Sequence, residues 1–324
     1  MKNKKVKVGC VIPCYKGSKK TINVIKSALK YTDLLVLVDD NCPYNTGERV
    51  ARLFANSDKV KVLHNKKNIG VGGSTIKGMK YLLKNNSTII VKVDADGQIN
   101  PQLIPKLIEP LIRREFDAAK GNRFSSLDHV LSMPFLRLIG NLGLSFLNKL
   151  SSGYWELFDP TNGLIAFTND GLVKVRLDKV DNRYFFESDL LFQCSLQNIC
   201  FTQLPMKSNY ADEESSLKPL LEIFRFSKKH LRNFLKRIIY QYFLLDFNIG
   251  SFEILSSTVL SLILASLIIK TFLNGAFNNQ FATPGEANLI ALLAIITSQL
   301  IIGFLYYDST QQPLLRRLKF RRKY

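Results

Sequence analysis

Two carboxylates one residue apart follow a β-branched run of the chain. Asp94 and Asp96 come directly after the segment Thr88–Val93, and Gly97 follows them. Alternate residues of an extended backbone point the same way, so both carboxylates can reach one ion from the tip of a strand. Mg²⁺ is usually held by one or two carboxylates together with substrate phosphates. The pattern therefore predicts a cation site, against the alternative of a solvated turn, where Asp and Gly are also common.

Strand-like and helix-like segments alternate over residues 1 to about 215. This alternation predicts an α/β domain with a mostly parallel sheet covered by helices. Ligands of such sheets gather at the carboxyl ends of the strands. The predicted strands are Val6–Ile12, Leu34–Val38, Val60–Leu63, Thr88–Val93 and Phe116–Lys120, and the predicted helices are Lys19–Lys30, Gly47–Ala55, Gly73–Lys84 and Pro101–Arg114.

Polar and glycine residues follow the other predicted strands as well. Tyr15 can cover a base, and Asp39 can accept hydrogen bonds from ribose or base groups. Arg123 carries a donor suited to a diphosphate. The segment Asn68–Gly73 permits close packing, although it lacks the spacing of a phosphate loop or a dinucleotide fingerprint. Together with the acidic pair, these residues predict a nucleotide-diphosphate site at one sheet edge.

The charge of the chain points to an anionic partner. Its 45 Lys and Arg residues against 26 Asp and Glu residues give a formal net charge of +19. Nucleic acid, anionic lipid and phosphorylated substrates all suit such a surplus. The basic residues gather around apolar segments and no nucleic-acid module is visible, so no nucleic-acid partner is expected. The five cysteines show neither a disulfide framework nor zinc spacing.

Two apolar segments near the end of the chain predict membrane spans. Phe252–Phe272 and Ala287–Tyr307 are each about 20 residues long, which as helices of roughly 30 Å match the hydrocarbon core of a bilayer. The alternative is a pair of buried core helices. Lys and Arg flank both segments and are missing from the loop Leu273–Gly285. The positive-inside rule therefore predicts a multi-pass protein of the inner (plasma) membrane, with the catalytic domain and both termini in the cytoplasm.

An amphipathic segment, Leu217–Asp246, precedes the first span. Its leucine and phenylalanine residues fall largely at helical spacing, with Lys and Arg on another face. This arrangement is typical of a helix in the membrane interface, and a surface helix packed on the soluble domain is the alternative. The predicted organisation is a domain at 1–215, interfacial helices at 216–250, a two-helix transmembrane hairpin at 251–308 and a basic tail at 309–324.

A set of motifs is distributed over nearly the whole chain. These motifs are Val11–Tyr15, Val38–Asp40, Asn68–Gly70, Asp94–Gln98, Gly121–Phe124, Asp159–Gly163, Phe185–Leu191 and Lys236–Phe243. As a set they resemble the landmarks of family 2 glycosyltransferases, which have the GT-A fold. Within that family the nearest likeness is to polyprenyl-phosphate glycosyltransferases, namely dolichyl-phosphate mannose synthases and bacterial bactoprenol glucosyltransferases. The chain departs from the usual pattern at Lys16–Gly17 and Asn41–Cys42, both on the nucleotide side.

The resemblance implies an inverting transfer of a sugar from a nucleotide diphosphate to a polyprenyl phosphate. UDP-glucose and undecaprenyl phosphate are the expected substrates. Mg²⁺ or Mn²⁺ would be held by Asp94, Asp96 and Gln98, and Arg123 and Arg137 would bind the acceptor phosphate. The residues expected to bind the nucleotide sugar are Pro13, Tyr15, Asp39, Asp40, Asn68, Ala95 and Arg123.

Three further carboxylates are candidates for the catalytic centre. Asp159 could orient the acceptor or stabilise charge at the sugar, or it could cap a turn before Pro160. Glu187 and Asp189 stand where relatives with hydroxyl acceptors keep their base. A phosphate acceptor is already anionic at pH 7, so here they could instead be structural. The alternatives are a membrane glycosyltransferase with a glycan hydroxyl acceptor and a non-catalytic membrane scaffold. Oligomeric state stays open, with self-association compatible with a two-span anchor.

Overall fold

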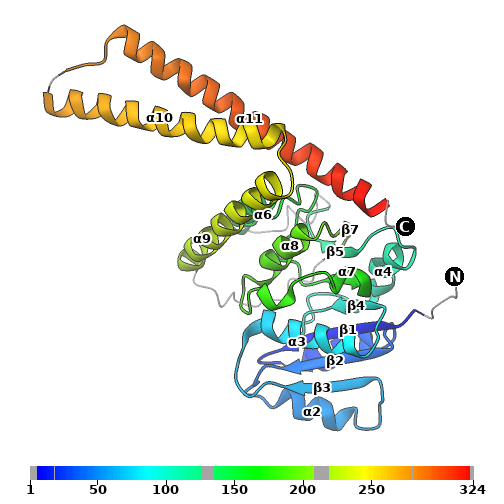
Figure 1. The fold of residues 1–324 in the computed structure, drawn as a ribbon. Coiled ribbons are helices and arrows are strands. Elements are labelled where there is room, and N and C mark those ends of the chain that lie inside the picture. The colour runs from blue at the N-terminus through cyan, green and yellow to red at the C-terminus, as the bar shows by residue number, and fades with distance from the viewer. Residues whose placement is uncertain (1–5, 18, 126–134, 208–218, 279, 322–324) are drawn as a thin grey trace. The chain divides into compact units, whose positions relative to one another are not determined.

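A seven-stranded sheet organises the N-terminal part of the chain in the computed structural model (Figure 1). The structure describes residues 6–17, 19–125, 135–207, 219–278 and 280–321. The strand order is β3-β2-β1-β4-β6-β5-β7, and β6 runs antiparallel to both of its neighbours while the other pairs are parallel. The strands are β1 (Val8–Cys14), β2 (Leu34–Asp39), β3 (Val60–His64), β4 (Ile89–Lys92), β5 (Ala118–Asn122), β6 (Ile165–Thr168) and β7 (Phe201–Pro205).

Helices cover both faces of this sheet, so the predicted mostly parallel α/β fold is confirmed. Ile25 and Leu107 belong to the core on one face, while Met79 and Leu191 belong to the core on the other. The sheet residues alternate between the two cores, as the pleat requires. The helical elements of this part are α1 (Lys19–Ala28), α2 (Thr46–Leu53), α3 (Gly70–Lys84), η1 (Pro101–Leu103), α4 (Ile104–Ile112), α6 (Phe135–Ser152), α7 (Asn169–Leu172), η2 (Leu177–Lys179) and α8 (Phe186–Leu196).

The start of α3 corrects one expectation. The predicted helix began at Gly73, but the structure begins it at Gly70, so most of the glycine-rich segment is the first helical turn. Gly70 has φ of +92° and lies against the carbonyl oxygen of Asn182, where a Cβ would collide with that oxygen. Gly73 N–H donates to the same oxygen at 3.0 Å. Glycine thus allows the helix start to contact the 181–182 backbone.

The C-terminal part contains two long apolar helices. After α9 (Pro219–Ile238) and a π-helical segment (Ile239–Leu244) come α10 (Ile249–Asn278) and α11 (Pro284–Arg321). The candidate spans Ile249–Asn278 and Pro284–Gln311 have mean hydropathies of 2.1 and 2.3. Their side chains are largely exposed, which disfavours the alternative of core helices in a soluble protein. Length and composition therefore suit a membrane crossing.

The chain divides into two compact units, each described here by itself. One unit comprises residues 1–234 and 316–324, and the other comprises residues 235–315. Within the second unit, the guanidinium of Arg237 makes two hydrogen bonds to the carboxylate of Asp308, at 2.7 and 2.9 Å, and Tyr242 Oη donates to the same carboxylate at 2.7 Å. All three side chains are buried, so each charge is paired where water is absent.

Candidate active site

A cavity of about 540 Å³ opens at the carboxyl ends of β1 and β4, beside the start of α3. Seven of the residues predicted to bind donor or metal line it. The lining also contains Arg183 and Tyr184, which the sequence did not indicate. The predicted residues on the lining are Pro13, Tyr15, Asp40, Asn68, Asp94, Ala95 and Asp96.

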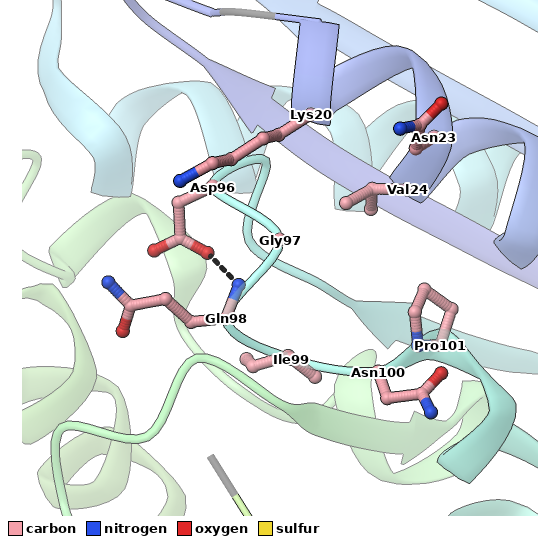
Figure 2. A pocket seen from close by; sticks show the side chains of 9 residues that line it. All are labelled: Lys20, Asn23, Val24, Asp96, Gly97, Gln98, Ile99, Asn100 and Pro101. Carbon is pink, nitrogen blue, oxygen red and sulfur yellow. Dashed lines mark hydrogen bonds between the residues drawn. The ribbon is translucent and has the colours of Figure 1, made fainter. Parts of the chain in front are cut away.

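The acidic pair stands on the loop that leaves β4. Gly97 has φ of +79°, and Gln98 N–H donates to Asp96 Oδ1 at 2.9 Å, which closes a tight turn. Gly163 lies directly against the carboxylate of Asp94, so close that a Cβ at position 163 would overlap this carboxylate. Asp96 also borders a second cavity of about 440 Å³, where Gln98 points to the same side and Lys20 of α1 extends toward Asp96 (Figure 2).

The two carboxylates fit a divalent cation that shares its ligands with a substrate. Asp94 and Asp96 both border the larger cavity and carry the hard oxygen ligands that Mg²⁺ and Mn²⁺ take. Across the described ranges, no group of three His, Cys, Asp or Glu side chains is arranged to hold a metal ion. A cation at this pair would therefore complete its coordination with other oxygen ligands, and a diphosphate carries oxygens of that kind.

A buried lysine connects the acidic pair to α8. Lys92 Nζ lies 2.7 Å from Asp94 Oδ1 and 3.0 Å from Glu187 Oε1, and its side chain is fully buried. Burial opposes the charge, but the two carboxylates outweigh burial and raise the pKa of Lys92 above its ordinary value. Glu187 is thus held at the edge of the site by its ion pair with Lys92.

The two carboxylates after β2 hold loops in place. Asp39 accepts hydrogen bonds from Cys42 N–H at 2.7 Å and Gly47 N–H at 2.6 Å, and it is not part of the cavity lining. Asp40 accepts hydrogen bonds from the N–H groups of Ile69 and Gly70, each at 2.8 Å. Asp40 therefore fixes the start of α3 while it lines the cavity.

Arg123 and Asp159, predicted for separate roles, form a pair. Arg123 Nε and Nη2 donate to the two carboxylate oxygens of Asp159 at 2.7 and 2.8 Å. Burial favours the neutral acid, but Arg123 holds the pKa of Asp159 below its ordinary value. Nearby, the buried Lys120 donates to the carbonyl oxygen of Asn162, and burial lowers the pKa of Lys120 to about 8.

Asp189 is bound to the backbone and to α9. It accepts hydrogen bonds from Asp181 N–H at 2.8 Å and from Asn233 Nδ2 at 2.7 Å. Burial outweighs these bonds and raises its pKa above the ordinary value. Arg137 belongs to α6, but its side chain lies outside the described residues, so its contact with the acceptor phosphate stays a prediction.

The cavity residues that the sequence did not indicate come from the segment between η2 and α8. Arg183 Nη1 donates to Asn68 Oδ1 at 2.9 Å, which joins segments 115 residues apart. No local sequence pattern predicts a contact between segments so far apart in the chain. Lys92 did carry a signal, because it ends β4 two residues before Asp94, and alternate residues of an extended backbone face the same side.

The chain is similar in sequence to enzymes that are named for transfer of sugars to lipid phosphates. The chain is 30% identical over 215 residues to the UDP-N-acetylglucosamine–dolichyl-phosphate N-acetylglucosaminyltransferase of Methanococcus voltae, covering 62% of this chain and 85% of that protein. It is 28% identical over 205 residues to the undecaprenyl-phosphate mannosyltransferase of Micrococcus luteus, covering 62% and 83%.

A solved structure agrees with the fold. Glucosyl-3-phosphoglycerate synthase from Mycobacterium tuberculosis, crystallised with Mn²⁺, UDP and glucosyl-3-phosphoglycerate, superimposes with a TM-score of 0.52 at 18% identity, over 72% of this chain and 80% of that one. The family model described as "Glycosyl transferase family 2" matches residues 10–175. This chain, with its acidic pair beside a cavity at the carboxyl edge of a GT-A sheet, belongs to glycosyl transferase family 2.

Proposed function

We propose that this protein transfers a sugar from a nucleotide diphosphate to the phosphate of a polyprenyl lipid, with inversion at the sugar. UDP-glucose and undecaprenyl phosphate are the proposed substrates. The observation that carries the proposal is the placement of Asp94 and Asp96 on one cavity with Tyr15 and Asn68, in a chain that also has two apolar helices. The relatives named for transfer to dolichyl and undecaprenyl phosphate support the acceptor class.

In this proposal Asp94, Asp96 and Gln98 hold Mg²⁺ or Mn²⁺ against the donor diphosphate. When bound, the cation neutralises charge on the departing nucleotide. The aromatic ring of Tyr15, half exposed at the cavity, covers the base. Arg183 keeps Asn68 oriented toward the same space through its hydrogen bond.

A phosphate acceptor suits the pairing of the other carboxylates. A hydroxyl acceptor must lose a proton as it attacks, so it requires a general base, whereas a phosphate monoester is already anionic at pH 7. Glu187 is engaged by Lys92, and Asp189 accepts two hydrogen bonds. These partners support positioning roles for both residues, and Arg123 and Arg137 are the proposed donors to the acceptor phosphate.

The proposed organisation places residues 1–215 in the cytoplasm at the membrane surface. Residues 216–250 would lie at the interface, the hairpin would span the bilayer, and the basic tail 309–324 would return to the cytoplasm. A polyprenyl phosphate presents its headgroup at that surface. Self-association of the hairpin remains a prediction.

The test is a donor screen with the full-length protein in detergent, a polyprenyl phosphate, and Mg²⁺ or Mn²⁺. UDP-glucose, UDP-N-acetylglucosamine and GDP-mannose are offered separately, and the glycolipid product is identified by mass spectrometry. Transfer should require the cation, and Asp94→Asn should abolish it. Asp58→Asn, at an exposed carboxylate between α2 and β3, is the matched control. Full activity of Asp94→Asn would refute the assigned cation site, and lack of transfer from every donor would refute the function.

A further inference from the structure

The segment between η2 and α8 forms one wall of the donor cavity. Arg183 and Tyr184 of this segment border the cavity, and Tyr184 is 58% exposed. Arg183 Nη1 donates to Asn68 Oδ1 at 2.9 Å, and Gly73 N–H donates to the carbonyl oxygen of Asn182 at 3.0 Å. These two hydrogen bonds attach the wall to the start of α3. The same segment is also bound by α9, through contacts that the donor site itself does not require.

The carboxylate of Asp181 joins this wall to α9. Its Oδ2 accepts a hydrogen bond from Lys229 Nζ of α9 at 2.5 Å, and its Oδ1 accepts one from Arg183 N–H at 2.8 Å. The side chains of Asp181 and Lys229 are 17% and 35% exposed, so the ion pair is partly withdrawn from water. One carboxylate therefore connects α9 to the backbone of a residue on the cavity wall.

A second carboxylate makes a similar connection. Asp189 Oδ1 accepts a hydrogen bond from Asn233 Nδ2 of α9 at 2.7 Å, and Asp189 Oδ2 accepts one from Asp181 N–H at 2.8 Å. Both Asp189 and Asn233 are buried. Lys229 and Asn233 stand four residues apart, so they project from the same side of α9. Two carboxylates, one partly exposed and one buried, therefore connect one side of α9 to residue 181.

An aromatic contact accompanies the two carboxylates. The ring of the buried Phe185 has its centroid 4.8 Å from that of His230 and 5.5 Å from that of Phe226, both in α9. Lys229 Nζ lies 5.3 Å from the Phe185 centroid, within the range of a cation–π contact. Phe185 directly follows Tyr184 in the chain. Packing of Phe185 against α9 therefore restricts the position of Tyr184 at the cavity.

We propose that Asp181 and Lys229 are positioning residues for the nucleotide donor, and that α9 holds the cavity wall in place through them. Without the ion pair, the Asp181 carboxylate is free to turn away from Arg183 N–H, so Arg183 and Tyr184 must be ordered when the donor binds. A site that pays this ordering cost binds its ligand less tightly. Neither Asp181 nor Lys229 lines the cavity, so donor affinity should respond more than the transfer step. The proposal rests on the proposed function, in which this cavity takes a nucleotide diphosphate.

The experiment measures binding of UDP and of GDP, each with Mn²⁺, to the full-length protein in detergent by calorimetry. Lys229→Met should raise the Kd of the nucleotide that wild type binds by roughly fivefold, the upper range for a partly exposed ion pair. In the transfer assay, KM for the donor should rise with it, while kcat should stay within about twofold of wild type. Lys229→Arg keeps the positive charge and the hydrogen-bond donors, so it should bind like wild type. The matched control is Lys228→Met, at the exposed neighbouring lysine of α9, which should also bind like wild type.

Hydrogen–deuterium exchange tests the same connection without measuring transfer. The N–H groups of Asp181 and Arg183 donate to the two carboxylates, so they report directly on the wall. In the nucleotide-free protein, peptides that contain them should exchange faster in Lys229→Met than in wild type or Lys228→Met. By linkage, UDP with Mn²⁺ should slow exchange around Lys229 in wild type. A role limited to overall stability would lower the Tm without these local responses.

Three results would overturn the positioning role. The first is a nucleotide Kd that Lys229→Met leaves unchanged. The second is equal weakening in Lys228→Met, which would indicate a general effect of positive charge on an anionic ligand. The third is unchanged exchange at residues 181–184 in Lys229→Met, which would show that α9 does not hold the wall. Failure of wild type to bind either nucleotide would refute the proposed function together with the positioning role, whereas normal wild-type binding that Lys229→Met does not alter refutes the positioning role alone.

Discussion

Lys92 and Asp94 form an ion pair two residues apart at the end of one strand, with Nζ 2.7 Å from Oδ1. Because alternate side chains of a strand share a side, the lysine reaches the carboxylate from within the sheet. Glu187 receives the same ammonium group from α8. The ammonium group of Lys92 therefore connects the donor cavity to the start of α8, and the position of Asp94 depends on it.

Removal of this lysine should impair sugar transfer. Lys92→Met leaves Asp94 and Glu187 facing each other without a shared counter-ion, so Asp94 should shift. We expect kcat/KM to fall by roughly tenfold or more, equal to about 1.4 kcal/mol of transition-state stabilisation. Lys106→Met, at an exposed lysine of α4, is the control and should transfer like wild type. Unchanged kcat/KM in Lys92→Met would contradict the dependence.

A double-mutant cycle separates pairing from general disruption. In the Lys92→Met background, Glu187→Gln should cost less than in wild type, because the second change relieves the repulsion that the first creates. The coupling energy should be about 1 kcal/mol, within the range for residues in contact. Thermal unfolding and kcat/KM of the four proteins measure it. Additive effects would show that Lys92 and Glu187 act separately.

The contact between Gly163 and Asp94 should be sensitive to one methyl group. Gly163→Ala places a carbon where the Asp94 carboxylate stands, so the carboxylate must move. We expect roughly a tenfold loss of kcat/KM with a weaker response to added Mn²⁺. In the control Gly285→Ala, the new carbon meets a single atom, Thr283 Oγ1, at 3.9 Å, and transfer should persist. Normal activity of Gly163→Ala would show that the carboxylate can move freely.

The buried Lys120 should make stability depend on pH in the alkaline range. Burial lowers its pKa to about 8, so between pH 8 and the unfolded value near 10.4 the unfolded chain binds more protons. Stability should therefore rise with pH across this window, by up to about 3 kcal/mol from this group. Lys120→Met should lack the rise, and Lys106→Met should retain it. Tm values in detergent from pH 7 to 10 measure the difference, and parallel curves for wild type and Lys120→Met would contradict it.

Asp189 distinguishes a phosphate acceptor from a hydroxyl acceptor. Its carboxylate accepts hydrogen bonds from a backbone N–H and from Asn233, so Asp189→Asn should turn an amide donor toward one of these donors. We expect the free energy of unfolding to fall by roughly 1–3 kcal/mol because hydrogen bonding is lost, and the Tm to fall with it. Below the new Tm, kcat should be largely retained. A general base at this position would instead lose kcat by about two orders of magnitude at unchanged Tm.

Local patterns predicted the sheet where strands are buried and follow the parallel alternation. The β-branched runs before Cys14, Asp39 and Asp94 gave β1, β2 and β4 within two residues. Strands β6 and β7 were not predicted. β6 is four residues long and enters antiparallel between β4 and β5, and β7 is an edge strand that ends in proline. Pairing with distant partners, rather than local sequence, makes these segments strands.

The site residues were likewise predicted only where local sequence determines their position. Residues at strand ends, such as Tyr15 and Asp94, were predicted because parallel strands bring their carboxyl ends to one edge. The hydrogen-bond and ion-pair partners of the site residues were not predicted. An aspartate after a strand has the same local sequence whether it binds a ligand or, like Asp39, accepts from loop N–H groups. The pairing of Arg123 with Asp159 likewise joins residues 36 positions apart.

The close approach of α3 to the 181–182 backbone has a consequence for biosynthesis. One wall of the donor cavity comes from Asn68–Val71 and the other from Arg183 and Tyr184, with Gly70 allowing the two to meet. When the first 150 residues have left the ribosome, the acidic pair has been made, but Arg183 and Tyr184 of the cavity wall are still missing. Nucleotide retention by nascent chains should therefore begin only after Tyr184 has emerged, so the ability to hold nucleotide marks completion of the domain.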